Sequence, residues 1–141
     1  MILLDTDHVS VLRYEEHPRC IALSARLESA RELEVAISVI TLEEQMRGWL
    51  AEIGRRRDVR EQITDYENLA KLVRFFNRWP LVPLDERAVD EFNILRKQRI
   101  RLSTPDLKIA SIALVHDALL LSANLRDFKK VPGLRVENWL E

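Results

Sequence analysis

The sequence contains little cysteine, glycine or proline and no long hydrophobic run. Its single cysteine, Cys20, excludes an intramolecular disulfide framework and a cysteine-based zinc site. Three glycines and five prolines in 141 residues leave no room for a low-complexity linker. No apolar run approaches the roughly 18–20 residues of a membrane span, and no basic segment precedes the apolar start. We therefore expect a cytoplasmic protein without a signal peptide or a membrane span.

The chain also lacks an excess of charge of either sign. Its 22 Lys and Arg residues nearly balance 23 Asp and Glu residues, which gives a net charge of −1. This balance excludes a strongly basic nucleic-acid wrapper and an acidic disordered tail, whereas local basic clusters stay compatible with nucleic-acid binding. A hydrophobic fraction of 47% over 141 residues is typical of one globular domain with one core, which we expect to span residues 1–141.

Short apolar runs recur along the chain and alternate with helical patterns. The runs predict strands at Met1–Leu4, Val35–Ser38, Leu81–Leu84, Leu119–Leu121 and, as a fifth candidate, Leu134–Val136. Pro83 has no N–H group for a central ladder, which indicates that its strand lies at an edge of the sheet. The alternation predicts an α/β fold with a parallel sheet of four to five short strands, flanked by helices on both faces.

Apolar residues at helical spacing fill the segments between the strands. We expect helices from about Val9 to Tyr14, from Pro18 onward, from about Leu42 to a stop at Gly54, from Asp58 to Trp79, and from Asp85 to about Gln98. The pattern over Asp58–Trp79 is the longest. A further helix opens with Thr104 as its capping hydroxyl and Pro105 at its first position, and its apolar continuation predicts a central element. We expect a loop after Leu121.

Acidic residues follow several of the predicted strands. In an open parallel sheet, ligands bind beyond the carboxyl ends of the strands. Side chains that come directly after a strand, or from the first turns of the neighbouring helices, therefore share one edge. The residues that we expect at this edge are Asp5, Glu44, Asp106, Asn124 and Asp127.

Each of these acids also has an ordinary structural explanation. Asp106 suits the first turn of its helix, where the helix dipole stabilises it by about 0.3–1 kcal/mol, and one of Glu43 and Glu44 is expected on the solvated surface. Their joint placement favours a site, because crowded carboxylates repel one another unless a cation neutralises them. Mg²⁺ and Mn²⁺ prefer such oxygen ligands, and either ion polarises a phosphoryl oxygen and activates water for phosphodiester hydrolysis.

Four segments resemble the motifs of one nuclease family. The opening Ile2-Leu3-Leu4-Asp5-Thr6-Asp7-His8 looks like the first motif of PIN-domain nucleases, and residues 37–44, followed by Gly48, are similar to the second. Residues 104–111 match the third motif, and residues 121–128, continuing through 134, match the fourth. Together the motifs cover nearly the whole chain in the right order and spacing. The sequence is most similar to VapC-type ribonuclease toxins of bacterial toxin–antitoxin modules.

The resemblance implies a PIN-like three-layer fold over residues 1–141 and an Mg²⁺- or Mn²⁺-dependent endoribonuclease. It further implies a homodimer that a cognate antitoxin holds inactive. Glu44 is chosen over Glu43 because the family's functional glutamate stands four residues before the glycine. The implied acidic set is thus Asp5, Glu44, Asp106 and Asp127, and Thr6 and Ser122 match hydroxyl positions near the metal-bound water. Asn124 departs from family members that carry an acid there, which puts a second metal site in doubt.

Within this set we assign roles as a hypothesis. Asp5 and Asp106 are the expected main metal ligands, while Asp127 and Glu44 act directly or through metal-bound water, and one of them helps to deprotonate the attacking water.

Bases must supply the contacts to the RNA phosphates. Lys129 and Lys130 are the preferred phosphate contacts because they adjoin Asp127 in the sequence. The denser clusters, Arg55–Arg57 and the bases between Arg96 and Arg101, are more typical of solvated helix ends. Contacts to RNA phosphates predict binding that weakens with salt.

Two other functions fit parts of the sequence. Asp5-Thr6-Asp7 also resembles the nucleophile loop of haloacid-dehalogenase-type phosphatases, but residues 122–125 lack the later acidic pair of those enzymes and little room is left for a cap domain. A catalytically idle binding protein that acts with an antitoxin on DNA would keep the fold. In such a protein four crowded carboxylates would be unnecessary repulsion. Added Mn²⁺ distinguishes this idle protein from a nuclease, because Mn²⁺ that binds a functional metal site raises the melting temperature.

Overall fold

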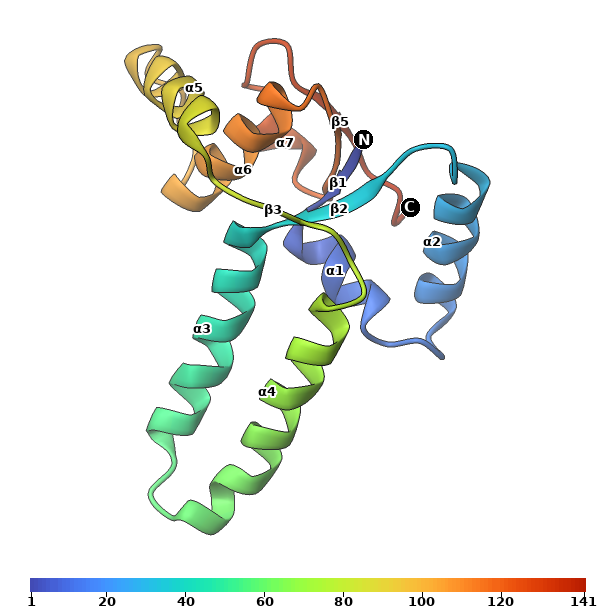
Figure 1. The fold of residues 1–141 in the computed structure, drawn as a ribbon, viewed down its shortest axis with the longest axis vertical. Helices are drawn as coiled ribbons and strands as arrows, with labels where there is room; N and C mark the ends of the chain where they lie inside the picture. Colours follow the sequence, from blue (N-terminus) through green and yellow to red (C-terminus); the bar gives the residue numbers. More distant parts are fainter.

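Five short parallel strands alternate with helices in the computed structural model, which describes residues 1–141 (Figure 1). The strands are β1 (Ile2–Leu4), β2 (Val35–Ser38), β3 (Leu81–Val82), β4 (Leu119–Leu121) and β5 (Arg135–Glu137). The helices are α1 (Thr6–Leu12), α2 (Pro18–Ser29), α3 (Val39–Arg55), α4 (Ile63–Phe76), α5 (Glu86–Lys97), α6 (Thr104–Val115) and α7 (Leu125–Phe128), and a 3₁₀ turn, η1 (Val59–Gln62), precedes α4. The predicted α/β class and parallel sheet are confirmed. None of the helices combines the length and apolarity that crossing a membrane requires.

Strand β1 lies at the centre of the sheet, whose order is β3-β2-β1-β4-β5. In the parallel register, Leu4 at the end of β1 is level with Ile37 of β2 and Leu121 of β4. The residues that follow these three strands therefore meet at one edge. The predicted edge position of β3 is confirmed, and β5 forms the opposite edge one residue later than expected.

The two faces of the sheet carry separate hydrophobic clusters. Successive side chains of β1 point to opposite faces, so Leu3 packs with α5, α6 and α7, while Ile2 and Leu4 pack with α1, α2 and α4. All three residues are completely buried, and full burial of such a side chain contributes about 1.5–3 kcal/mol to stability. The three-layer arrangement expected from the resemblance is thus formed by helices on both faces of a buried β1.

Helices α3 and α4 form a long antiparallel arm that projects away from the sheet (Figure 1). At its tip, the Arg56 guanidinium donates to both oxygens of the buried Asp65 carboxylate, with N–O distances of 2.9 and 3.3 Å. The Gln62 side chain donates to the carbonyl of Ile53 at 3.0 Å. These contacts satisfy polar groups where the chain reverses, so the arm has a defined end.

The helix boundaries within the arm differ from the expected ones. Helix α3 begins at Val39, because Ser38 caps it by accepting from Thr41 N at 3.3 Å, and it continues through Gly54 instead of stopping there. A glycine costs only about 1 kcal/mol relative to alanine near a helix end, so Gly54 did not force a stop. The expected single helix over Asp58–Trp79 is divided into η1 and α4, and α3 is the longer element.

Three other expectations about local structure were wrong in detail. Helix α1 begins at Thr6 rather than Val9, because the Asp5 carboxylate accepts from Thr6 N and caps the helix. Ser103, not Thr104, caps α6 by accepting from Asp106 N at 3.2 Å, which moves Pro105 from the first to the second helical position. The segment expected as a loop after Leu121 contains the short helix α7.

Candidate active site

The carboxyl edge of the sheet gathers acidic side chains from four separate segments. Asp5 follows β1, Glu44 lies in the second turn of α3 after β2, and Asp106 lies in the first turn of α6. Asp127 comes from α7, which follows β4. The sequence-predicted residues therefore arrive at one edge of the molecule, but their environments differ.

Asp5 is the most buried acid of the group, with 7% of its surface exposed. Its Oδ1 accepts from Thr6 N at 2.8 Å, and its Oδ2 accepts from the fully buried Ser122 hydroxyl at 2.7 Å. Burial raises the pKa of Asp5 to about 6, against the lowering effect of the Ser122 hydrogen bond. The negative charges of Asp7 and Asp106 add to the increase. Asp5 thus holds a charge that its surroundings disfavour.

Glu44 of α3 and Asp106 of α6 are electrostatic neighbours. Burial is the main reason that the pKa of each is raised, and the Asp106 charge further raises the pKa of Glu44. Glu44 Oε1 and the hydroxyl of Thr6 are both buried without a hydrogen-bond partner. The nearby Thr6 hydroxyl slightly lowers the pKa of Glu44, but the two groups do not reach hydrogen-bond geometry. An unpaired buried carboxylate oxygen is costly, and it indicates a position prepared for a ligand.

The neighbouring Glu43 has a different environment. It is exposed on the outer side of α3 and pairs with Arg47 at 2.6 Å, one helical turn further on. Its charge raises the pKa of Glu44, but less than burial and Asp106 do. Of the two adjacent glutamates, Glu44 is therefore the one that lies with the acidic group.

Asp127 is held by its own neighbours instead of being left unpaired. The Asn124 amide donates to its Oδ2 and the Lys130 ammonium to its Oδ1, both at 3.1 Å. These two contacts, first that of Asn124, lower the pKa of Asp127. The charge of Asp127 still raises the pKa of Asp106, so the two acids are electrostatic neighbours.

The PIN domain family matches residues 2–134, which is nearly the whole chain. The chain belongs to the PIN domain family.

The relatives of this PIN domain are named as nucleases. It is 28% identical to "Ribonuclease VapC2" of Rickettsia felis, over 97% of this chain and 96% of the relative. It is 27% identical, over the same fractions, to "tRNA(fMet)-specific endonuclease VapC" of Salmonella typhimurium. Among solved structures, VapBC2 from Rickettsia felis bound to a promoter DNA fragment aligns over 99% of both chains, with 26% identity and a TM-score of 0.76.

Asp7 belongs to the acidic edge of this PIN domain and was missing from the predicted set. Its Oδ2 accepts from Ala123 N at 2.9 Å and lies 3.4 Å from the Ser122 hydroxyl, while its Oδ1 accepts from the His8 ring. Asp7 thereby connects the end of β1 to the loop after β4. The second acid of the Asp5-Thr6-Asp7 segment was the signal in the sequence, but one acid in a helical first turn is too common to single out.

The basic residues that were considered for phosphate binding occupy separate places. Lys129 and Lys130 are both exposed beside Asp127, but Lys130 is already bound to Asp127 and lies 3.4 Å from the Arg101 carbonyl. The Arg55–Arg57 cluster lies at the tip of the arm, where Arg55 pairs with Glu52 and Arg56 with Asp65. Of these two groups, the lysines therefore adjoin the acidic residues and the Arg55–Arg57 cluster does not.

The acidic group fits a hard divalent cation by its donor chemistry. Its members offer carboxylate and hydroxyl oxygens, one of which, Glu44 Oε1, is buried and unpaired. No three His, Cys, Asp or Glu side chains lie close enough together to hold a metal ion by themselves. Mg²⁺ needs fewer protein ligands, because it keeps several waters and is usually held by one or two carboxylates together with a substrate phosphate.

Proposed function

We propose that this PIN domain is a divalent-metal-dependent endoribonuclease and the toxin of a toxin–antitoxin pair. The main supporting observation is that burial, together with the charges of nearby acids, raises the pKa values of Asp5, Glu44 and Asp106 at one edge of the sheet. Buried and crowded carboxylates are costly to ionise unless a cation neutralises them. The nuclease names of the full-length relatives support the same activity.

Asp5 and Asp106 are the proposed principal ligands of Mg²⁺ or Mn²⁺, and Asp127 and Glu44 would bind it directly or through water. When bound, the ion supplies Lewis-acid polarisation of a phosphoryl oxygen and lowers the pKa of a bound water. Its positive charge would also oppose the effect of burial and of the neighbouring acids on the pKa values, because an opposite charge favours the ionised carboxylates. The carboxylates that are costly to ionise without metal would therefore be stabilised by metal binding.

The remaining side chains orient the ligands and the water. Ser122 donates to Asp5 Oδ2 and fixes the carboxylate, while the amide of Asn124 orients Asp127. Glu44 is suited to accept a proton from the attacking water, since burial raises its pKa toward the working pH. The unpaired hydroxyl of Thr6 is available to hydrogen-bond that water.

Lys129 and Lys130 are the proposed phosphate contacts beside the cut. Lys129 is exposed and forms no ion pair, so it can bind a phosphate oxygen without first releasing another partner. Lys130 must leave its ion pair with Asp127 before it binds a phosphate. Because such partly exposed ion pairs contribute only about 0–1 kcal/mol to stability, this exchange costs little. Metal binding at Asp127 and phosphate binding by Lys130 would then favour each other.

The partners follow from the solved relatives. VapBC2 from Rickettsia felis was determined with promoter DNA, and a further structure is named as a toxin–antitoxin complex from Klebsiella pneumoniae. We propose that residues 1–141 act as one domain, assemble as a homodimer, and bind a cognate antitoxin that blocks RNA cleavage. With RNA as its substrate, the protein would act in the cytoplasm.

The decisive experiment is RNA cleavage by protein that is free of any co-purified partner. Structured and unstructured RNAs are incubated with Mn²⁺ or Mg²⁺, beside controls with EDTA and with the Asp5→Asn and Asp106→Asn variants. We expect internal cleavage that is lost in all three controls. Unchanged cleavage by the two variants would remove the proposed site. No cleavage of any RNA, together with no stabilisation by Mn²⁺, would favour a catalytically idle protein that acts on DNA with an antitoxin.

A further inference from the structure

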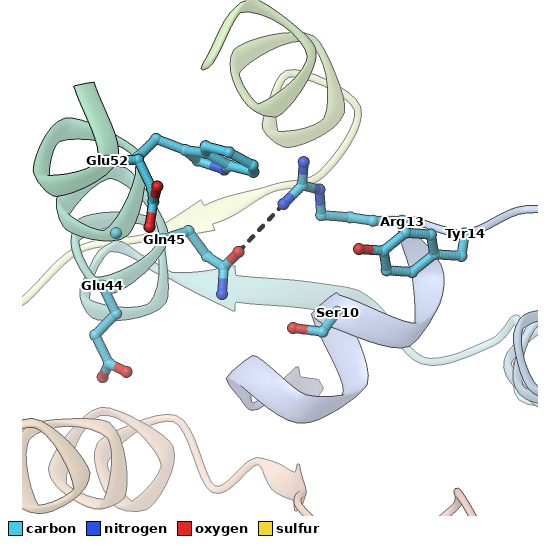
Figure 2. A pocket seen from close by; sticks show the side chains of 8 residues that line it. Ser10, Arg13, Tyr14, Glu44, Gln45 and Glu52 are labelled. Carbon is cyan, nitrogen blue, oxygen red and sulfur yellow. Dashed lines mark hydrogen bonds between the residues drawn. The ribbon is translucent and has the colours of Figure 1, made fainter. Parts of the chain in front are cut away.

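A basic groove adjoins the acidic edge and lies between α1, α3 and α4. One pocket, of about 320 Å³, is lined by Glu44 and Ser10 at the acidic end and by Arg13, Tyr14 and Trp49 (Figure 2). A second pocket, of about 740 Å³, shares Arg13, Tyr14 and Trp49 and continues along α4. Because the two pockets have these three residues in common, they lie side by side, and together we call them the groove, which begins at the proposed catalytic acid.

The far part of this groove carries unpaired positive charge. Lys71 and Arg74 line it from one face of α4, since they are three residues apart, and Arg78 lines it from the turn after that helix. Lys71, Arg74 and Arg13 form no ion pair, although Arg13 donates to the Gln45 side chain at 3.3 Å (Figure 2). Arg78 pairs with Glu15 at 3.1 Å, with both side chains more than half exposed. In a chain of net charge −1, this concentration of free cations is local and not a general property of the surface.

The acidic residues of the groove do not cancel this charge. Glu52 is engaged by Arg55 and Arg56 on its own helix. Glu15 is bound to Arg78 through an exposed pair of the kind that contributes little and that a phosphate can replace. A polyanion in the groove would therefore meet three free cations and a fourth that is readily released.

Two aromatic side chains lie where the pockets join. Tyr14 is 69% exposed, and Trp49 is partly exposed on α3. Exposed aromatic rings beside a basic track are the combination that binds single-stranded nucleic acid, since the rings stack on bases while the cations hold the phosphates. Figure 2 shows Tyr14 and Arg13 on the α1 side of the pocket, opposite Gln45 and Glu52 of α3.

We propose that this groove binds the single-stranded RNA segment that flanks the scissile phosphate. Lys71, Arg74 and Arg78 hold its phosphates, and Tyr14 and Trp49 stack on its bases. The inference rests on the proposed ribonuclease function and assigns to the same site the path of its substrate. The groove thereby selects RNAs with an unpaired stretch next to the cut.

The first test measures RNA affinity in EDTA with Asp5→Asn protein, which cannot cut its ligand. The double variant Lys71→Ser/Arg74→Ser removes two free cations from the groove. Its matched control, Arg57→Ser/Arg60→Ser, removes the same charge from exposed positions at the tip of the arm. We expect only the groove variant to weaken binding, and to lower the slope of log Kd against log salt by about 1.4, the value for two phosphate contacts on a single strand. Equal loss in both variants, or in neither, would overturn the proposal.

The second test separates the groove from the catalytic group. In otherwise wild-type protein with Mn²⁺, the groove variant is expected to cut an RNA of about 12 nucleotides more slowly and one of about 4 nucleotides at the wild-type rate, because only the longer strand reaches the groove. Tyr14→Ala is expected to weaken binding of the longer RNA at least about fivefold. If wild type cuts no RNA, the proposed function fails; if groove variants cut both RNAs like wild type, only the groove proposal fails. Loss of antitoxin binding with RNA binding intact would assign the groove to the protein partner instead.

Discussion

The backbone N–H of Trp139 donates to Nε2 of His8 at 3.2 Å, across 131 positions of sequence. Because Nε2 accepts, the ring hydrogen lies on Nδ1, which donates to Asp7. Asp7 in turn accepts from the loop after β4. The chain's last residues are thus connected through a completely buried ring to the acidic edge.

His8→Ala is expected to lower the free energy of unfolding by about 1–3 kcal/mol, because the variant leaves the partly buried N–H of Trp139 and the Asp7 carboxylate without their partner. The loss should be accompanied by slower RNA cleavage, since Asp7 then loses one of the contacts that hold it beside Ser122. Urea denaturation measures the first effect, and a cleavage assay measures the second. His116→Ala is the control, because His116 ends α6 away from these contacts and should change neither. Equal stability of the two variants would show that the His8 contacts contribute nothing.

Strands β1, β2 and β4 could be predicted from the sequence because each is a short, largely buried apolar run, whereas β3 and β5 at the two edges of the sheet are more exposed. Leu3, Leu4 and Leu120 have no exposed surface, so hydrophobicity alone marks their positions. The meeting of Asp5, Glu44 and Asp106 followed from the rule that parallel strands end at one edge. That rule needs only the order of strands and helices and no knowledge of individual contacts.

Details that depend on tertiary contacts could not be predicted in the same way. Helix α3 passes Gly54 and ends where Arg56 turns to bind Asp65, nine residues away. The Asn124 and Lys130 contacts of Asp127 require α7, a four-residue helix in a segment whose composition indicates a loop. The role of Asp7 depends on Ala123, which is its neighbour only after β1 and β4 have paired.

Asp5 should make stability depend on pH in the absence of metal. Its pKa in the folded protein is about 6, above the ordinary 3.8, so the folded state binds this proton more tightly than the unfolded state does. The stabilising effect is present below pH ~4 and is lost as the pH rises through about 6. Relative to Asp5→Asn, the free energy of unfolding of wild type is therefore expected to fall by about 3 kcal/mol between pH ~4 and pH ~6. Above pH ~6 the difference should change little.

Urea denaturation in EDTA at several pH values measures this difference. Asp90→Asn, a change at an exposed position of α5, serves as the matched variant and should follow wild type at every pH. A constant difference between Asp5→Asn and wild type from pH ~4 to 8 would contradict the raised pKa.

Metal binding should raise the melting temperature through Asp106. An ion that binds only the folded state raises the free energy of unfolding by about 2.7 kcal/mol when its concentration is one hundred times its Kd. We expect Mn²⁺ to stabilise wild type and Asp90→Asn alike, and to have much less effect on Asp106→Asn. Below pH ~5, Mn²⁺ should raise the melting temperature of wild type less, because protons then compete with the metal for carboxylates whose pKa values are raised. Equal stabilisation of Asp106→Asn and wild type would place the ion elsewhere.

Glu44 and Glu43 provide the sharpest comparison, because one charge is removed from each of two adjacent residues on one helix. Glu44→Gln removes a carboxylate that burial and Asp106 disfavour, so without metal it should be more stable than wild type. Its cleavage rate should nevertheless fall at least about a hundredfold, the usual loss when a positioned proton acceptor is removed. Glu43→Gln breaks only the exposed pair with Arg47, and should lower the free energy of unfolding by a few tenths of a kcal/mol and leave cleavage unchanged.

The two variants together test the role of Glu44. If Glu44→Gln raises stability and slows cleavage, while Glu43→Gln lowers stability and leaves cleavage unchanged, Glu44 serves activity at the expense of stability. If both variants cut RNA at similar rates, Glu44 has no catalytic role and the unpaired Oε1 needs another explanation.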